Sequence, residues 1–227
     1  FRSLLVIQAI FLCVAFYELL GICVAYKKQP EVSNTTKKET KNGSWNECSE
    51  NTERAVIIEK NPEALLQRVR LIKNAKKEII LSTFAFQSDE SGKLILGALH
   101  DAADRGVHIR LLVDGMESWI DMEGNPYFYG LSSHENVEIK LYNKANPLKP
   151  WKMMGRMHDK YLIADGKTYI LGGRNTYNYF LGDFPGHKNY DRDVLVVCDE
   201  PEKENSVNQL LEYFETIWEH EDSDYFH

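Results

Sequence analysis

The order of hydrophobic and polar positions divides the chain into three parts. Residues 1–26 form a nearly all-apolar segment with one interior acid, Glu18. A helix needs about 20 apolar residues to cross a bilayer, so this segment predicts a retained transmembrane anchor rather than a cleaved signal peptide. Residues 27–53 are polar and rich in Lys, Glu, Asn, Ser and Thr, which is typical of a flexible linker. Residues 54–227 carry regular apolar patterns and predict one globular domain.

Within the globular domain, strand patterns alternate with helix patterns. Short apolar runs predict strands, and longer stretches with an apolar stripe predict helices. The expected strands are Ala55–Ile58, Glu78–Phe86, Val107–Val113, Val137–Tyr142 and Arg192–Cys198. The expected helices are one that starts at Asn61-Pro62, with Asn61 as its cap, and the stretches Gly92–Arg105 and Pro201–His220. This order predicts an α/β fold, a layered domain with a mixed β-sheet flanked by helices and preceded by the transmembrane helix.

The stretch Met157–Asn175 combines a strand pattern with reactive side chains. Successive side chains of a strand point to opposite faces, so His158 and Lys160 share one face and Asp165 belongs to the other. Asp165-Gly166 is a strong hairpin signal. We therefore expect Asp165 to hold the turn and to bond nearby backbone, rather than to act as a partner of His158.

A return strand at Lys167–Leu171 is followed by a pair of glycines and by the polar residue Asn175. Gly172-Gly173 is expected to let the backbone come close to whatever His158 and Lys160 face. Asn175 is expected at the start of the next helix, where free backbone N–H groups favour an anion.

The spacing of these residues resembles a known signature. His158-x-Lys160, four residues, Asp165, six residues and Gly172-Gly173-x-Asn175 resemble the HKD motif of the phospholipase D superfamily. The usual form has Gly-Ser where this chain has Gly-Gly, so one hydroxyl is absent. The resemblance extends from about Glu59 to Trp218, roughly one HKD half, and is similar to the first half of bacterial cardiolipin-synthase-like membrane proteins.

The resemblance implies a phosphodiesterase or phosphatidyltransferase that acts on phospholipids through a phosphohistidine. His158 would be the nucleophile, or the acid if the two halves exchange roles. Lys160 and Asn175 would bind the phosphate and stabilise its charge. Asp165 would be the structural member of the motif. The chemistry needs no metal and no cofactor, and the sequence has no metal-type His/Cys spacing.

Other candidate site residues flank the motif. The resemblance implies that an acid near the following strand fixes the histidine of the opposite half; Asp193 is the first match and Asp191 the second. We also expect Gly172, Gly173 and Arg156 to contact substrate. Asn143–Arg156 is a basic, apolar loop placed to meet a phosphate and a lipid interface, although an ordinary solvated loop with a packed Trp has the same composition.

The chain contains one H-x-K-x4-D match and no second. The family's active site lies between two HKD halves, because attack and leaving-group protonation need separate histidines. A second half would therefore be a C-terminal half cut away from this sequence, which is the favoured reading, or the mate in a homodimer. The partners implied are a phospholipid, a membrane and this second half.

The net charge and the cysteines alter the expected function little. The net charge of -7 argues against a general nucleic-acid binder, so an HKD nuclease is the alternative enzyme, and a non-catalytic half that binds anionic lipid is the alternative outside enzymes. The anchor implies a single-pass protein of the cell membrane. Lysines after the anchor favour a cytoplasmic domain, but residues before Phe1 would change that count, so the side stays open. A Cys48–Cys198 disulfide is an alternative to the preferred free thiols.

Overall fold

The computed structural model describes residues 2–27, 33–34, 37–38, 53–200 and 205–226, and most of the expected linker lies outside them. The chain divides into two compact units. One contains α1 (Arg2–Lys27) and the loop Ala145–Gly155, which includes the 3₁₀ turn η1 (Pro150–Lys152). The other is a sheet domain made from residues 52–144 and 156–227. By length and composition α1 satisfies the requirements of a membrane-spanning helix over Leu4–Lys27.

The sheet domain contains one mixed sheet of eight strands in the described residues, in the order β1-β7-β6-β5-β2-β3-β4-β8. β2, β3 and β4 run parallel to one another, and the remaining neighbours pair antiparallel. The strands are β1 (Glu53–Ile58), β2 (Glu78–Thr83), β3 (His108–Asp114), β4 (Val137–Tyr142), β5 (Lys160–Ala164), β6 (Thr168–Gly172), β7 (Asp193–Cys198) and β8 (Ser223–Tyr225). The expected layered α/β fold is confirmed.

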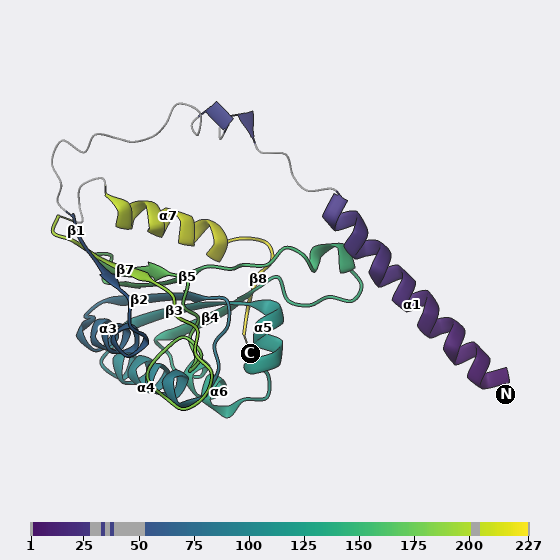
Figure 1. Cartoon of the computed structure of the whole chain (residues 1–227), viewed down its shortest axis with the longest axis horizontal. Helices are drawn as coiled ribbons and strands as arrows, with labels where there is room; N and C mark the ends of the chain where they lie inside the picture. The colour runs from purple at the N-terminus through teal and green to yellow at the C-terminus, as the bar shows by residue number, and fades with distance from the viewer. Residues whose placement is uncertain (1, 28–32, 35–36, 39–52, 201–204, 227) are drawn as a thin grey trace. The chain divides into compact units, whose positions relative to one another are not determined.

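Helices cover both faces of this sheet (Figure 1). On one face lie α3 (Asn61–Asn74), α4 (Glu90–Asp104) and α6 (Pro126–Ser132), while α7 (Ser206–Trp218) lies on the other. The short helix α5 (Gly115–Asp121) follows β3 directly. In β2, Ile79 and Leu81 pack into the core on the side of α3 and α4, and Ile80 packs on the side of α7. Because both faces are covered, the middle of β2, Ile79–Leu81, is apolar on both sides.

The β5–β6 hairpin crosses the middle of the sheet. β5 pairs with β2 on one side and β6 on the other, and all five of its residues are buried. Asp165 and Gly166 have φ values of 55° and 61°. Positive φ at both central residues is the signature of the tight turn that Asp-Gly favours, so the expected hairpin is confirmed.

Some element boundaries differ from the sequence expectation. β2 ends at Thr83, and only Phe86 beyond it makes a bridge, to Thr176. α3 begins at Asn61 itself, so the expected cap is wrong: Lys60 precedes the helix, and the Asn61 amide bonds more distant parts of the chain. The apolar patterns also gave no sign of α5, α6 or β8, which have seven, seven and three residues.

Candidate active site

Lys160 is the first residue of β5, His158 precedes the strand by two residues, and both lie beside Phe84. The Lys160 ammonium donates a hydrogen bond to the His158 carbonyl at 2.7 Å. The Phe84 ring packs edge-on against the exposed His158 imidazole, with ring centroids 4.7 Å apart, and its centroid lies 5.4 Å from Lys160 Nζ. A buried ammonium therefore lies next to an exposed imidazole.

Burial lowers the pKa of Lys160 below its ordinary value, because a desolvated ammonium is less stable. The carboxylates of Asp159 and Asp191 oppose this effect by favouring the charged form. Asp191, the second choice from sequence for the family's acidic residue, is thus one of the charges that act on Lys160.

Asn175 is joined to the same end of the sheet through the segment that follows β2. Its Oδ1 accepts a hydrogen bond from the Ala85 N–H at 3.3 Å, and the Thr176 N–H donates to the Ala85 carbonyl at 3.0 Å. The Thr176 hydroxyl bonds that of Thr83 at 3.2 Å, and Thr83 pairs with Lys160 across the sheet. These contacts bring both ends of the motif together. No helix starts at Asn175, so that expectation is wrong; the residue lies in an irregular segment directly before the bridge that Thr176 makes with Phe86.

Gly172 and Gly173 are close to two acidic residues that precede or start β7. A Cβ added to Gly172 would collide with the Asp193 carboxylate and would lie 2.7 Å from the Arg192 carbonyl. A Cβ added to Gly173 would collide with the Asp191 carboxylate. The glycines therefore allow β7 and the residues before it to come close to the motif, and the expected contact of the glycines with substrate stays a prediction.

Asp193 is buried between two arginines. Its Oδ2 lies 2.9 Å from Nη1 of Arg68 and 3.2 Å from Nη1 of Arg174, and none of these side chains is more than 5% exposed. This cluster gives Asp193 a set of partners within its own sheet domain, where the sequence suggested a histidine of an opposite half.

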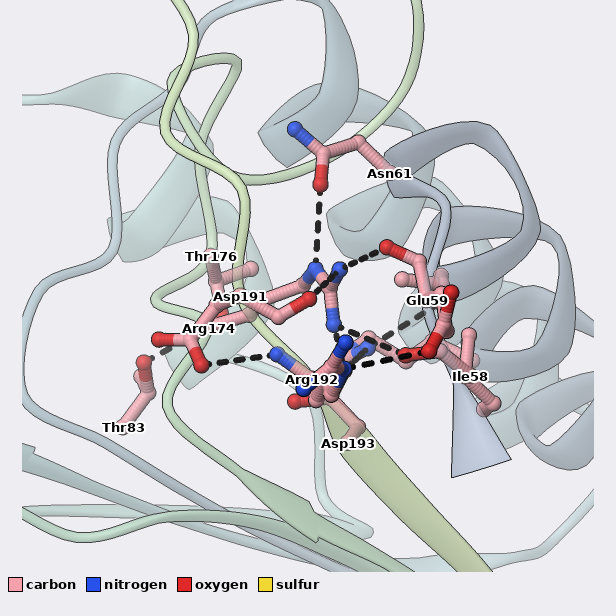
Figure 2. A network of polar contacts seen from close by, with 11 residues as sticks. Ile58, Glu59, Asn61, Thr83, Arg174, Thr176, Asp191, Arg192 and Asp193 are labelled. Carbon is pink, nitrogen blue, oxygen red and sulfur yellow. Dashed lines mark hydrogen bonds and ion pairs between the residues drawn. The ribbon is translucent and has the colours of Figure 1, made fainter. Parts of the chain in front are cut away.

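Arg174 is the centre of a wider network that sequence reasoning missed (Figure 2). Its guanidinium donates to the Asn61 side chain at 3.1 Å, to the Ile58 carbonyl at 3.2 Å and to the Glu59 carbonyl at 2.6 Å. It also donates to the Asp191 carbonyl. Arg174 thus ties the motif to the end of β1, the start of α3 and the approach to β7. Its place between Gly173 and Asn175 was the only sequence signal available.

Asp165 lies at the far end of β5 from His158. Its carboxylate accepts hydrogen bonds from the N–H groups of Lys76, Lys77 and Glu78 at 2.9, 2.7 and 3.1 Å. These groups belong to the connection between α3 and β2. The geometry agrees with the structural role expected from strand alternation.

Arg156 supports the entry to β5. Its guanidinium donates to Asp114 at 3.1 Å and to the Asn143 carbonyl at 2.5 Å. Asp114 is fully buried, accepts from the Met157 N–H at 3.0 Å and caps α5 through the Met116 N–H at 2.9 Å. Burial raises the pKa of Asp114, while Arg156 and these N–H groups oppose the shift. These contacts join Arg156 to Asp114 and Asn143, and its expected contact with substrate stays a prediction.

Neither a metal site nor a disulfide is found among the described residues. No group of three or more His, Cys, Asp or Glu side chains in it is arranged to hold a metal ion. Cys198 is a buried free thiol, and its suggested partner Cys48 lies outside the described residues.

Comparison with known proteins gives the same family as the motif. Residues 68–218 match the family model described as "Cardiolipin synthase, PLD-like domain". Over 171 residues the chain is 29% identical to cardiolipin synthase C of Escherichia coli, which covers 69% of this chain and 34% of that protein. It is 34% identical over 141 residues to an uncharacterized protein of Helicobacter pylori, with 57% and 28% covered.

A solved structure shares the fold. The phospholipase D family member Nuc from Salmonella typhimurium superposes with a TM-score of 0.57 at 18% identity, over 77% of this chain and 99% of that chain. The chain described here spans about a third of the length of the curated relatives it matches.

Proposed function

The chain belongs to the phospholipase D superfamily as a cardiolipin-synthase-like domain, and we propose that it is a membrane-anchored phosphodiesterase or phosphatidyltransferase that acts on phospholipids. The observation that carries the proposal is the placement of an exposed His158 imidazole beside the buried Lys160 ammonium, with Asn175 joined to the same end of the sheet. This set offers one nucleophile and two groups that bind a phosphate.

The reaction would proceed in two displacements. A neutral His158 nitrogen attacks phosphorus, a P–N bond forms, and the P–O bond to the leaving alcohol breaks with its electron pair on oxygen. That oxygen takes a proton from a general acid. Water or a second alcohol then attacks the phosphohistidine, gives up its proton to the same group and releases His158. Water gives hydrolysis, and an alcohol gives phosphatidyl transfer.

Lys160 and Asn175 would stabilise the transition state. An ammonium has three N–H donors, and Lys160 gives one of them to the His158 carbonyl. The others are suited to the equatorial phosphate oxygens, where negative charge gathers. The low exposure of Lys160 strengthens this interaction, because few waters compete with the phosphate.

The general acid would be a second histidine from another HKD half. A second copy of this chain can supply it across a two-fold axis, and a further half on a longer chain can supply it as well. Mixing His158→Ala chains into wild-type protein distinguishes the two sources. Specific activity should fall faster than the wild-type fraction if two copies share a site, and in proportion to it if they do not.

Membrane anchoring would come from α1. An 18-residue window within Leu4–Lys27 has a mean hydropathy of 2.2, and 6% of that window is buried. A helix of this length and apolarity is suited to a single-pass position in the cell membrane.

The substrate class is testable with the full chain in lipid vesicles. Vesicles of phosphatidylglycerol should yield phosphatidic acid or cardiolipin, and His158→Ala protein should yield neither. Turnover should survive chelation of divalent ions, since the described residues offer no metal cluster. Cleavage of single-stranded DNA in place of lipid would contradict the proposal and favour a nuclease.

A further inference from the structure

The loop Ala145–Gly155 groups with the apolar helix α1. Two of the contacts between them lie in the C-terminal half of the helix. The Tyr17 hydroxyl donates to the Leu148 carbonyl at 3.0 Å. Pro150 is seated on Gly21, and both residues are buried. A Cβ at Gly21 would lie 2.5 Å from Pro150 Cγ, so the absence of a side chain at this position is what permits the contact.

The outer surface of the loop is apolar and basic. Leu148, Trp151 and Met154 are 78%, 45% and 55% exposed, and the exposed Lys149 stands among them. Trp is favoured at the boundary between hydrocarbon and water, and a Lys there can bury its stem while its ammonium reaches phosphate oxygens. Exposed apolar side chains next to a lysine are suited to an anionic lipid surface, which takes both kinds of group at once.

The attachment point on α1 sets the depth of the loop. Gly21 is six residues before Lys27, which is about 9 Å along a helix. If Lys27 lies among the headgroups, Gly21 lies near the edge of the hydrocarbon core, because headgroup regions are about 5–8 Å thick. A loop seated on Gly21 is therefore at the depth where Trp and Lys side chains are most stable.

We propose that Ala145–Gly155 is an interfacial loop that inserts into the headgroup region of an anionic bilayer and is held there by its contacts with Gly21 and Tyr17 of α1. The inference rests on the proposed membrane anchor. The loop would be a second attachment to lipid, close in sequence to the strand that carries the motif. His158 follows Gly155 by three residues, which span at most about 10 Å, so the loop would restrict His158 to the neighbourhood of the phosphates.

The test measures the depth of a fluorophore on the loop. The full chain, with Cys13, Cys23, Cys48 and Cys198 replaced by Ala, carries Leu148→Cys labelled with an environment-sensitive dye. It is placed in nanodiscs of phosphatidylglycerol and phosphatidylcholine that contain lipids with nitroxides at a shallow or a deep position. Phe11→Cys in the middle of α1 reports insertion of the helix, and Leu94→Cys, exposed on α4, is the reference.

The shallow nitroxide should quench the label at position 148 at least twofold more than the label at position 94. The deep nitroxide should quench the label at position 11. If position 11 is quenched and position 148 is not, the loop proposal is wrong and the anchor stands. If neither position 11 nor position 148 is quenched, the membrane anchor and the loop proposal are both wrong. A blue shift at position 148 without quenching would indicate a protein partner or a second copy and would overturn the lipid assignment.

Two matched variants test the attachment to α1. Gly21→Leu should reduce quenching at position 148 to the level of the reference, because a side chain there displaces Pro150. Ala15→Leu adds the same side chain on an exposed position of α1 and should leave quenching unchanged. Lys149→Glu should lower quenching more as the phosphatidylglycerol content rises. Equal quenching in Gly21→Leu and Ala15→Leu protein would refute the role of the contact between Gly21 and Pro150.

Discussion

Arg174 and Asp193 form an ion pair of 3.2 Å in which both side chains are fully buried. Arg68 contacts the same carboxylate from α3, so one acid holds two arginines from different parts of the chain. Such a cluster is stable only while each charge keeps its partner, because an uncompensated buried charge is expensive.

Asp193→Asn should therefore lower the free energy of unfolding by about 3–5 kcal/mol, since it leaves two buried guanidinium groups without a counter-charge. Urea denaturation of the detergent-solubilised full chain measures the change. The matched control is Asp199→Asn, directly after the last residue of β7. This change breaks an exposed ion pair with Arg54, and the variant should unfold like wild type. Equal losses in the two variants would show that the buried cluster has no special role.

Asp165→Asn and His158→Ala should separate stability from chemistry. Asp165 accepts three backbone N–H groups, so the change to Asn should lower the free energy of unfolding by roughly 1.5–3 kcal/mol. His158 is exposed, so its removal should change that free energy by only about 0.5 kcal/mol while it abolishes turnover. Unfolding curves and lipid turnover of both variants are the measurements. An Asp165→Asn protein that has normal stability but no turnover would contradict the structural role given to Asp165.

The alkaline limb of the pH–rate profile should report Lys160. Burial lowers its pKa, so the ammonium that binds phosphate should be lost at a pH below the ordinary lysine value of 10.5. Asp159→Asn and Asp191→Asn each remove a charge that raises this pKa and should move the limb to lower pH, while Asp183→Asn on an exposed loop should not. A limb that stays fixed in all three variants would assign it to another group.

The same pKa shift has a consequence for stability. Between the lowered pKa of folded Lys160 and 10.5, the unfolded chain binds more protons than the folded chain. The contribution of Lys160 to stability therefore rises with pH across this window. Lys160→Met protein lacks this contribution, so the stability of wild-type protein minus that of the variant should rise with pH across the window.

Substitution of a closely packed glycine and of a glycine with open space around it should have opposite effects on stability. Gly172→Ala should lower the free energy of unfolding by roughly 1–3 kcal/mol, because its Cβ meets a carboxylate that two arginines hold in place. Gly97→Ala in α4 meets no atom within 4 Å and should raise it by about 0.5–1 kcal/mol through helix propensity. Thermal unfolding of the two variants shows the signs directly. A stabilised Gly172→Ala protein would contradict the packing described for β6 and β7.

The sequence predicts those features that are encoded locally. Asp165-Gly166 specifies its own turn, and the period-two pattern before it places Leu162 in the core on one face of the sheet and Ile163 in the core on the other. Both follow from neighbouring residues alone. The α/β alternation is equally local, since each strand and long helix carries its own apolar period.

Features made by distant residues were beyond the sequence. Arg174 finds its partners at Ile58, Glu59 and Asn61, more than 110 positions earlier, so no local pattern marks it as buried. Arg156 is basic and close to His158, so the sequence suggests a phosphate ligand, but it could not show that the guanidinium bonds Asp114 and the Asn143 carbonyl. The sequence could suggest a lipid-facing loop before Arg156, but not its seat on Gly21.

The central claim is that His158 becomes covalently phosphorylated by a phospholipid, and isolation of that intermediate tests it most directly. The full chain is mixed with phosphatidylglycerol vesicles, quenched in base within the first turnover and digested, and the peptide around His158 is analysed by mass spectrometry. The account predicts a phosphatidyl adduct on the His158 imidazole that is absent from His158→Ala protein and disappears when an acceptor alcohol is added. Undiminished turnover in His158→Ala protein, or an adduct on another residue, would contradict it.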